Sequence, residues 1–133
     1  MENNHKGEFR FAYFSSIYKE TIEFYKNVLE FKLNFSWDRG PNDKGSVFSY
    51  GSGLIEILQQ PDNELEFNLG LDHRSPQGSF MVIETVNIEN IFSKYKNKKI
   101  NFKQKLTTQS WGHKSFSISD PNGVVLFFFE NVE

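Results

Sequence analysis

The chain has 133 residues, of which 15 are basic and 17 acidic, and its formal net charge is −2 at pH 7; this length fits one compact domain or two small repeats that share one fold. The acidic balance argues against a nucleic-acid partner, and the absence of cysteine excludes disulfides, thiolate metal sites and cysteine nucleophiles. No apolar run approaches the roughly 20 residues of a membrane span, and the N-terminus lacks the regions of a signal peptide, so we expect a cytoplasmic protein with no membrane partner.

The first half of the chain predicts a strand, a helix and three further strands. The first strand is a nearly continuous aromatic run, and the helix is indicated by apolar residues spaced by three and four. Ser15 or Ser16 could cap the start of that helix. The second strand alternates apolar and polar residues, which predicts one apolar face formed by Phe31, Leu33, Phe35 and Trp37. In chain order the expected elements are 9–14, 19–29, 31–37, 47–50 and 54–59.

The second half repeats this order after a polar segment over 61–78 that contains proline and glycine and is expected to be a linker. Asn87 is a good N-cap for a helix whose apolar residues recur at i, i+3, i+4 and i+7. Lysines near the end of that helix suit the helix dipole, and we expect them to be solvated. In chain order the expected elements are 80–84, 88–95, 100–106, 113–119 and 124–130.

This duplicated order predicts an α+β fold of two βαβββ modules that form a curved mixed sheet around a central cavity. One amphipathic helix per module implies helices on one face of each sheet, so that the other faces line the concavity. Concave, mostly apolar sites are where small ligands bind. We expect a single domain over 1–133, with a first module at about 9–60, the linker over 61–78 and a second module at about 79–130.

Two motifs lie at matching places in this pattern. The first helix contains Phe24-Tyr25-Lys26-Asn27-Val28-Leu29, and the second half contains Trp111-Gly112, Phe116 and the turn Asp120-Pro121-Asn122-Gly123. Together, in this order, they resemble the vicinal oxygen chelate superfamily, which includes glyoxalase I, extradiol dioxygenases, fosfomycin resistance enzymes and bleomycin resistance proteins. The resemblance covers roughly residues 9–130 and implies a homodimer as the usual state.

The superfamily's enzymes hold one divalent metal with His, Gln or Glu side chains from the first and last strands of each module. The resemblance places these four positions at Arg10, Glu56, Phe80 and Phe127. An arginine offers no lone pair, and phenyl rings are not ligands for Zn, Fe, Mn or Ni. We therefore predict no metal site and no cofactor.

Glu56 lies between two isoleucines in its strand, so its side chain is expected on the face opposite theirs. Arg10 is expected on an adjacent strand of the same face. The two could form an ion pair that satisfies both charges. Alternatively, Glu56 could be the counter-charge for a cationic ligand or a general base, and Arg10 could bind a negative group.

Aromatic residues make up 17% of the chain, and 15 residues are phenylalanine, which predicts an aromatic-rich interior or pocket. Trp111 could be a stacking wall for a flat or cationic group, whereas packing is favoured for Trp37. His113 is more typical of a surface histidine than of a proton shuttle. Four phenylalanines are expected on the cavity side of their strands, where they could either line the cavity or fill it: Phe14, Phe80, Phe127 and Phe129.

The preferred function is metal-independent binding, with sequestration, of a small aromatic or cationic organic molecule, in the manner of bleomycin resistance proteins and their role in antibiotic resistance. The expected ligand-binding residues are Arg10, Phe14, Trp37, Glu56, Phe80, Trp111, His113 and Phe127. The alternative is an isomerase, lyase, transferase or dioxygenase of the superfamily, with a displaced or absent metal and Glu56 as its catalytic base. A third hypothesis is a structural or regulatory dimer that binds no ligand.

Overall fold

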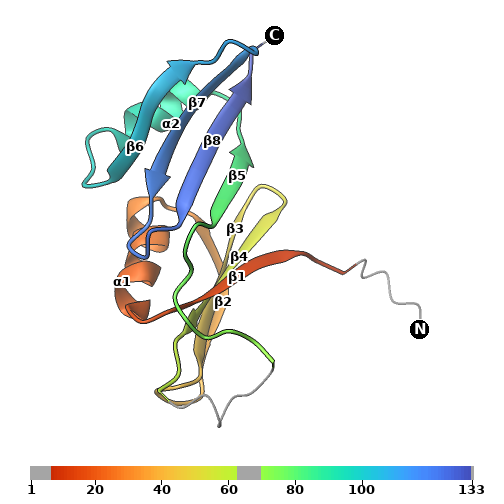
Figure 1. Ribbon diagram of the computed structural model, residues 1–133, viewed down its shortest axis with the longest axis vertical. Coiled ribbons are helices and arrows are strands. Elements are labelled where there is room, and N and C mark those ends of the chain that lie inside the picture. The colour runs from red at the N-terminus through yellow and green to blue at the C-terminus, as the bar shows by residue number, and fades with distance from the viewer. Residues whose placement is uncertain (1–6, 63–69, 133) are drawn as a thin grey trace. The chain divides into compact units, whose positions relative to one another are not determined.

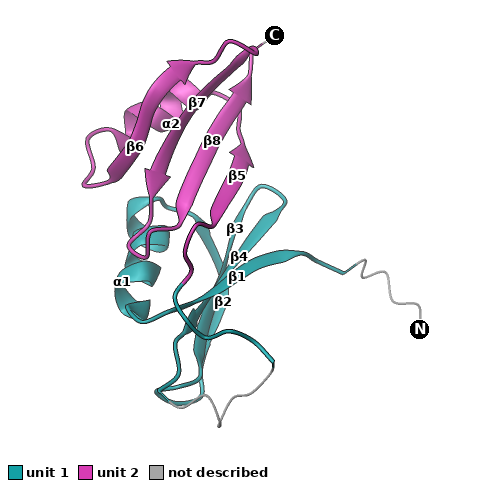
Figure 2. Ribbon diagram, viewed as in Figure 1, with its two compact units in different colours: residues 1–75 teal, residues 76–133 magenta. Residues whose placement is uncertain are grey.

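The computed structural model describes residues 7–62 and 70–132 of the chain (Figure 1). The chain divides into two compact units, residues 1–75 and 76–133 (Figure 2). Within the described residues, each unit has one four-stranded mixed sheet and one helical segment. The predicted α+β fold of two similar modules with curved sheets is therefore confirmed. The central cavity stays a prediction.

Unit 1 follows the predicted order of strand, helix and three strands. Its sheet has the order β1-β4-β3-β2, in which β1 runs parallel to β4 and the other neighbours are antiparallel. The parallel pair needs a long crossover, which the helical segment and two strands supply. The elements are β1 (Arg10–Ser15), α1 (Tyr18–Glu23), the π-helical turn η1 (Phe24–Val28), β2 (Lys32–Asp38), β3 (Lys44–Tyr50) and β4 (Gly53–Gln59).

The core of unit 1 lies between the helical segment and one face of the sheet. Tyr25 is fully buried, and its ring centroid is 5.8 Å from that of Phe48 on β3. Ile55 and Ile57 on β4 are buried on the same face, because alternate residues of a strand share a face. Burial of each such large apolar side chain contributes about 1.5–3 kcal/mol to folding.

The first helix differs from the single helix predicted over 19–29. It changes from α-helical to π-helical at Phe24, and the backbone N–H of Leu29 donates to the Phe24 carbonyl at 2.9 Å. Neither Ser15 nor Ser16 is the N-cap residue, because the helix begins after Ile17. The Ser15 hydroxyl instead accepts a hydrogen bond from the Ile17 N–H at 3.1 Å.

Unit 2 has the same topology, with the sheet order β5-β8-β7-β6 and a parallel β5–β8 pair. In Figure 1, α2 lies behind this sheet. Phe116 and Phe128 are fully buried in the core and stack with their centroids 4.9 Å apart, and Tyr95 of α2 packs edge-on against both. The elements are β5 (Phe80–Glu84), α2 (Ile88–Tyr95), β6 (Asn101–Thr108), β7 (His113–Ser119) and β8 (Val125–Asn131).

The start of α2 is capped from another strand. Asn87 occupies the N-cap position, as predicted, but it has a φ of 56° and its side chain makes no capping hydrogen bond. The Glu130 carboxylate of β8 instead accepts from the backbone N–H groups of Asn87 and Ile88, both at 3.1 Å. A carboxylate at this place also interacts favourably with the helix dipole.

Candidate functional site

Each sheet has one face packed on its helix and one face turned away from it. We call the latter the first open face in unit 1 and the second open face in unit 2. Strand register assigns residues to these faces, because residues paired across neighbouring strands point to the same side. The first open face carries Arg10, Phe14, Phe35, Trp37, Val47 and Glu56. The second carries Phe80, Val82, His113, Phe127 and Phe129.

The predicted ion pair between Arg10 and Glu56 is present on the first open face. Arg10 Nη1 donates to Glu56 Oε1 at 2.9 Å, and the Glu56 side chain is only 17% exposed. The opposite edge of the guanidinium binds Glu8: Nε donates to Glu8 Oε1 at 2.8 Å, and Nη2 contacts the same oxygen. The hydrogen bond to Glu56 and then that to Glu8 raise the pKa of Arg10, so its charge is permanent.

Phe35 contributes an aromatic surface beside this ion pair. The Arg10 guanidinium carbon lies 5.4 Å from the centroid of the Phe35 ring, within the range of a cation–π interaction. Phe35 remains 48% exposed. The first open face therefore combines a fixed cation, a carboxylate and an accessible ring.

The prediction that Phe31, Leu33, Phe35 and Trp37 share one face is wrong. The register of β2 against β3 shifts between Leu33 and Phe35, and the extra residue is Asn34. Leu33 pairs with Phe48 on the helix side, whereas Phe35 pairs with Val47 on the open side. A β-bulge reverses the side of every later residue, which places Phe35 and Trp37 on the first open face.

Trp37 packs against β3 on this face. A Cβ built on Gly45 would lie 2.1 Å from Trp37 Cζ2, so the indole occupies the space that any larger residue there would need. The indole N–H donates to Asp43 Oδ1 at 3.1 Å, and the Arg39 guanidinium lies 5.6 Å from the Trp37 ring. The hydrogen bond from Arg39 is the main reason that the pKa of Asp43 is lowered.

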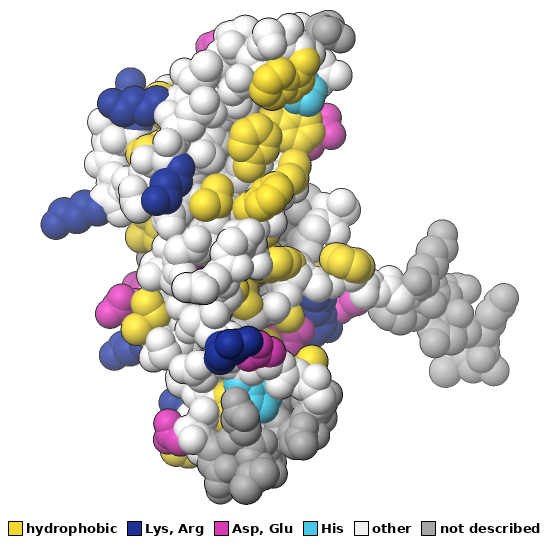
Figure 3. All heavy atoms as spheres, viewed as in Figure 1, with side chains coloured by type: hydrophobic (Ala, Val, Ile, Leu, Met, Phe, Trp, Pro, Cys, Tyr) yellow, Lys and Arg dark blue, Asp and Glu magenta, His cyan; other side chains and the backbone are white. Residues whose placement is uncertain are grey.

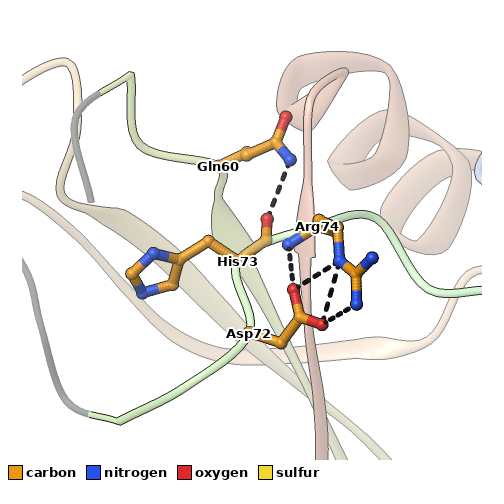
Figure 4. A network of polar contacts seen from close by, with 4 residues as sticks. All are labelled: Gln60, Asp72, His73 and Arg74. Atoms are coloured by element: carbon orange, nitrogen blue, oxygen red, sulfur yellow. Dashed lines mark hydrogen bonds and ion pairs between the residues drawn. The ribbon is translucent and has the colours of Figure 1, made fainter.

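Phe14 is on the first open face but is covered. It is 5% exposed, because the ring of His73 packs edge-on against it with centroids 4.6 Å apart. Gln60 donates to the His73 carbonyl at 2.8 Å, and the pair Asp72 and Arg74 brackets the histidine (Figure 4). Hydrogen bonds from Arg74 lower the pKa of Asp72 to about 2. A ligand on this face reaches Phe14 only if the His73 ring moves.

The second open face combines exposed apolar side chains on β5 with half-buried phenylalanine rings on β8. Phe80 is 61% exposed and Val82 59%, and the Phe127 and Phe129 rings on β8 lie 6.3 Å apart, nearly parallel. Figure 3 shows hydrophobic side chains gathered over β5 and β8, beside a histidine. Phe80 and Phe127 share this face, as the alternation of side chains along their strands predicts.

His113 and Trp111 extend this face at one end. The His113 imidazole stacks on Phe129 with centroids 4.7 Å apart, and the Trp111 indole meets His113 edge-on at 6.3 Å. Trp111 is 59% exposed, so its ring is available for stacking. Polar groups lie nearby, since Gln109 Nε2 donates to the Ser115 hydroxyl at 2.9 Å.

The residues at the four positions that the resemblance matches to metal ligands do not fit a divalent metal. Arg10 is a permanent cation, and Phe80 and Phe127 have no donor atoms, which leaves Glu56 as the one oxygen ligand of the four. Within residues 7–62 and 70–132, no three His, Cys, Asp or Glu side chains are grouped in a way that could hold a metal ion.

Three residues on or beside these faces are not among the site residues predicted from the sequence: Glu8, Phe35 and Val82. Strand alternation carried the signal for two of them, since Glu8 and Val82 lie two residues from Arg10 and Phe80. Phe35 could not be assigned to its side without knowledge of the bulge at Asn34.

The duplicated βαβββ topology and the two open faces define a class of protein, the vicinal oxygen chelate type. A family model of the Glyoxalase/Bleomycin resistance protein/Dioxygenase superfamily matches residues 9–128. The chain belongs to this superfamily. A comparison with curated protein sequences gave no match.

Solved structures of low sequence identity share the fold. TioX from Micromonospora sp. ML1 matches with a TM-score of 0.75 and 12% identity, over 94% of this chain and 98% of TioX. A superfamily member from Sphaerobacter thermophilus matches with a TM-score of 0.73 and 18% identity, over 95% and 98% of the two chains. TnmS3, an antibiotic-binding protein from Streptomyces sp. CB03234, matches with a TM-score of 0.70 and 12% identity, over 98% and 99%.

Among the residues that the structure describes, no helix is long and apolar enough to cross a membrane.

Proposed function

We propose that this protein binds and sequesters a small aromatic or cationic organic molecule without a metal ion. The observation that carries the proposal is the second open face, where large apolar side chains are exposed side by side instead of being buried. Exposed apolar patches of this kind mark interaction sites more often than ordinary surface. The name of TnmS3, an antibiotic-binding protein with the same fold, supports a small organic molecule as the occupant.

Ring stacking is the main attraction that this face offers. Trp111, Phe80, Phe127 and the His113–Phe129 stack present ring faces or edges to a flat molecule. An aromatic pair contributes about 0.5–1.5 kcal/mol beyond the apolar area that it buries. Several such contacts are enough to hold a drug-sized aromatic ligand.

On the first open face, Glu56 offers a separate contact for a cationic group. Its Oε1 is bound to Arg10, and no described residue donates to its Oε2. A ligand ammonium can therefore donate to Oε2 in a partly buried setting, where charge-assisted hydrogen bonds are strong.

Calorimetric titration with three matched probes tests the proposal: 2-naphthylmethylammonium, 2-naphthoate and 2-naphthalenemethanol. We expect all three to bind, and we expect Trp111→Leu to weaken each by about tenfold, the equivalent of one lost stacking contact. Phe9→Leu is the control, because Phe9 is 88% exposed and precedes β1. On the first open face, taken by itself, Glu56→Gln should weaken binding of the ammonium probe alone. If no probe binds, or if Trp111→Leu has no more effect than the control, the proposal is wrong.

The second candidate is an enzyme of the superfamily with Glu56 as its base. The half-buried carboxylate of Glu56 on the first open face, whose Oε2 accepts from no described residue, favours it. A turnover whose pH–rate profile disappears in Glu56→Gln would support this candidate. Turnover that Glu56→Gln leaves unchanged would remove it.

The proposal includes a homodimer, which the resemblance implies, and a location in the cytoplasm. Sedimentation equilibrium would test the dimer, and a mass of one chain at all concentrations would contradict it.

A further inference from the structure

The guanidinium of Arg10 is shared between two carboxylates that differ in how firmly they are held. Glu56 lies within β4, is 17% exposed and binds the Nη1 corner. Glu8 lies outside the sheet, two residues before Arg10, and its side chain is 41% exposed. Glu56 is thus a fixed part of the face, whereas Glu8 occupies the Nε/Nη2 edge from the solvent side.

Glu8 binds this edge with only one of its two carboxylate oxygens. Both Nε and Nη2 contact the same oxygen, Oε1, so the second carboxylate oxygen is not engaged by Arg10. A free carboxylate can place one oxygen on each nitrogen in the fork geometry, which is stronger and more specific. An exposed ion pair of the Glu8 type contributes little to stability. An incoming carboxylate therefore has little to displace and a better geometry to gain.

We propose that the Nε/Nη2 edge of Arg10 is a binding site for the carboxylate of an aromatic acid, and that Glu8 is an internal competitor that occupies it when no ligand is bound. Exchange of one carboxylate for another leaves the local charge unchanged. Phe35 lies against the guanidinium, 5.4 Å from its carbon, and is 48% exposed, so a ring attached to the carboxylate finds an aromatic neighbour. This inference rests on the proposed function and names an acidic group for a ligand of the first open face.

Replacement of Glu8 gives the decisive test. Glu8→Gln frees the edge and removes a repelling charge, so we expect calorimetric affinity for 2-naphthoate to rise about 1.5- to 5-fold, as expected for loss of one exposed ion pair. Affinity for 2-naphthalenemethanol should not change, and that for 2-naphthylmethylammonium should not rise. The control is Glu20→Gln, which removes the same charge from the exposed surface of α1.

Arg10 itself is tested with two variants. Arg10→Gln should lower the affinity for 2-naphthoate by about 10- to 100-fold, in line with loss of a charged hydrogen-bond donor. Arg10→Lys keeps the charge but not the fork, and should lie between Arg10→Gln and the native protein. Circular dichroism of both variants checks that the fold is retained.

A direct readout separates this inference from the proposed function. Sodium acetate should shift the NMR signal of the Arg10 Nε–H saturably, and more readily in Glu8→Gln than in the native chain. If the aromatic probes bind but neither acetate nor Glu8→Gln has these effects, the inference is wrong and the proposed function stands. If acetate shifts the signal as expected but no aromatic probe binds, the carboxylate site exists and the proposed function fails.

Discussion

Gly45 on β3 shows how one residue shapes the first open face. The absence of a side chain at this position lets the Trp37 indole lie against the sheet, and the indole N–H then reaches Asp43. A glycine inside a strand normally weakens it, and it is often found where another group approaches the backbone closely. Here the approaching group is the indole of Trp37, which lies on the same face as the Arg10–Glu56 ion pair.

Gly45→Ala should therefore displace Trp37. The new Cβ would lie within 2.1 Å of the ring, far inside van der Waals contact, so the indole has to leave the sheet. We expect a loss of about 1–3 kcal/mol in the free energy of unfolding, typical of overpacking, and a red shift of Trp37 fluorescence in a Trp111→Phe background. Urea denaturation and emission spectra measure both effects.

Gly53→Ala is the matched control. A Cβ at Gly53 would meet only the Tyr50 carbonyl oxygen, at 3.5 Å, which is an ordinary contact. Equal changes in the two variants would contradict the packing of Trp37 on Gly45.

At the scale of elements, the duplicated pattern of strands and helices could be predicted, because it follows from local periodicity. The bounds of β5 and α2 agree with the predicted ranges 80–84 and 88–95. Alternation also predicted that Arg10 and Glu56 meet, since both residues lie in regular strands paired in parallel.

The features that could not be predicted depend on contacts between distant segments. The bulge at Asn34 comes from the register of β2 against β3, and it alone decides the side on which Phe35 and Trp37 lie. The π-helical turn after Glu23 and the capping of α2 by Glu130 likewise have no local signature in the sequence. For the same reason, the covering of Phe14 by His73 was not foreseen.

Glu130→Gln tests the capping of α2. The substitution removes the negative charge at the start of the helix and weakens the acceptors of two backbone N–H groups, so we expect a loss of about 1 kcal/mol in unfolding free energy. Glu84→Gln is the control, because it makes the same chemical change at an exposed position at the end of β5. A loss in Glu130→Gln that does not exceed the control, in urea denaturation at pH 7, would show that the carboxylate is not the cap.

At the scale of the whole molecule, superfamily membership defines the fold but not the chemistry, because one fold supports many functions. The function has to be argued from the two open faces. The first combines a permanent cation with a half-buried carboxylate, and the second combines exposed and half-buried aromatic rings. Of the four positions that the resemblance matches to the superfamily's metal ligands, only Glu56 has a suitable donor. The central claim is therefore that this chain binds its ligand through side chains alone.

The most direct test of this claim is calorimetric titration of one aromatic probe, 2-naphthoate, into the same protein before and after exhaustive treatment with EDTA. We expect the same dissociation constant for 2-naphthoate in both samples, and no change in it when Zn²⁺, Ni²⁺, Mn²⁺ or Fe²⁺ is then added. Binding that is lost with EDTA and restored by one of these ions at one equivalent per chain would contradict it, and the enzyme candidate would then lead.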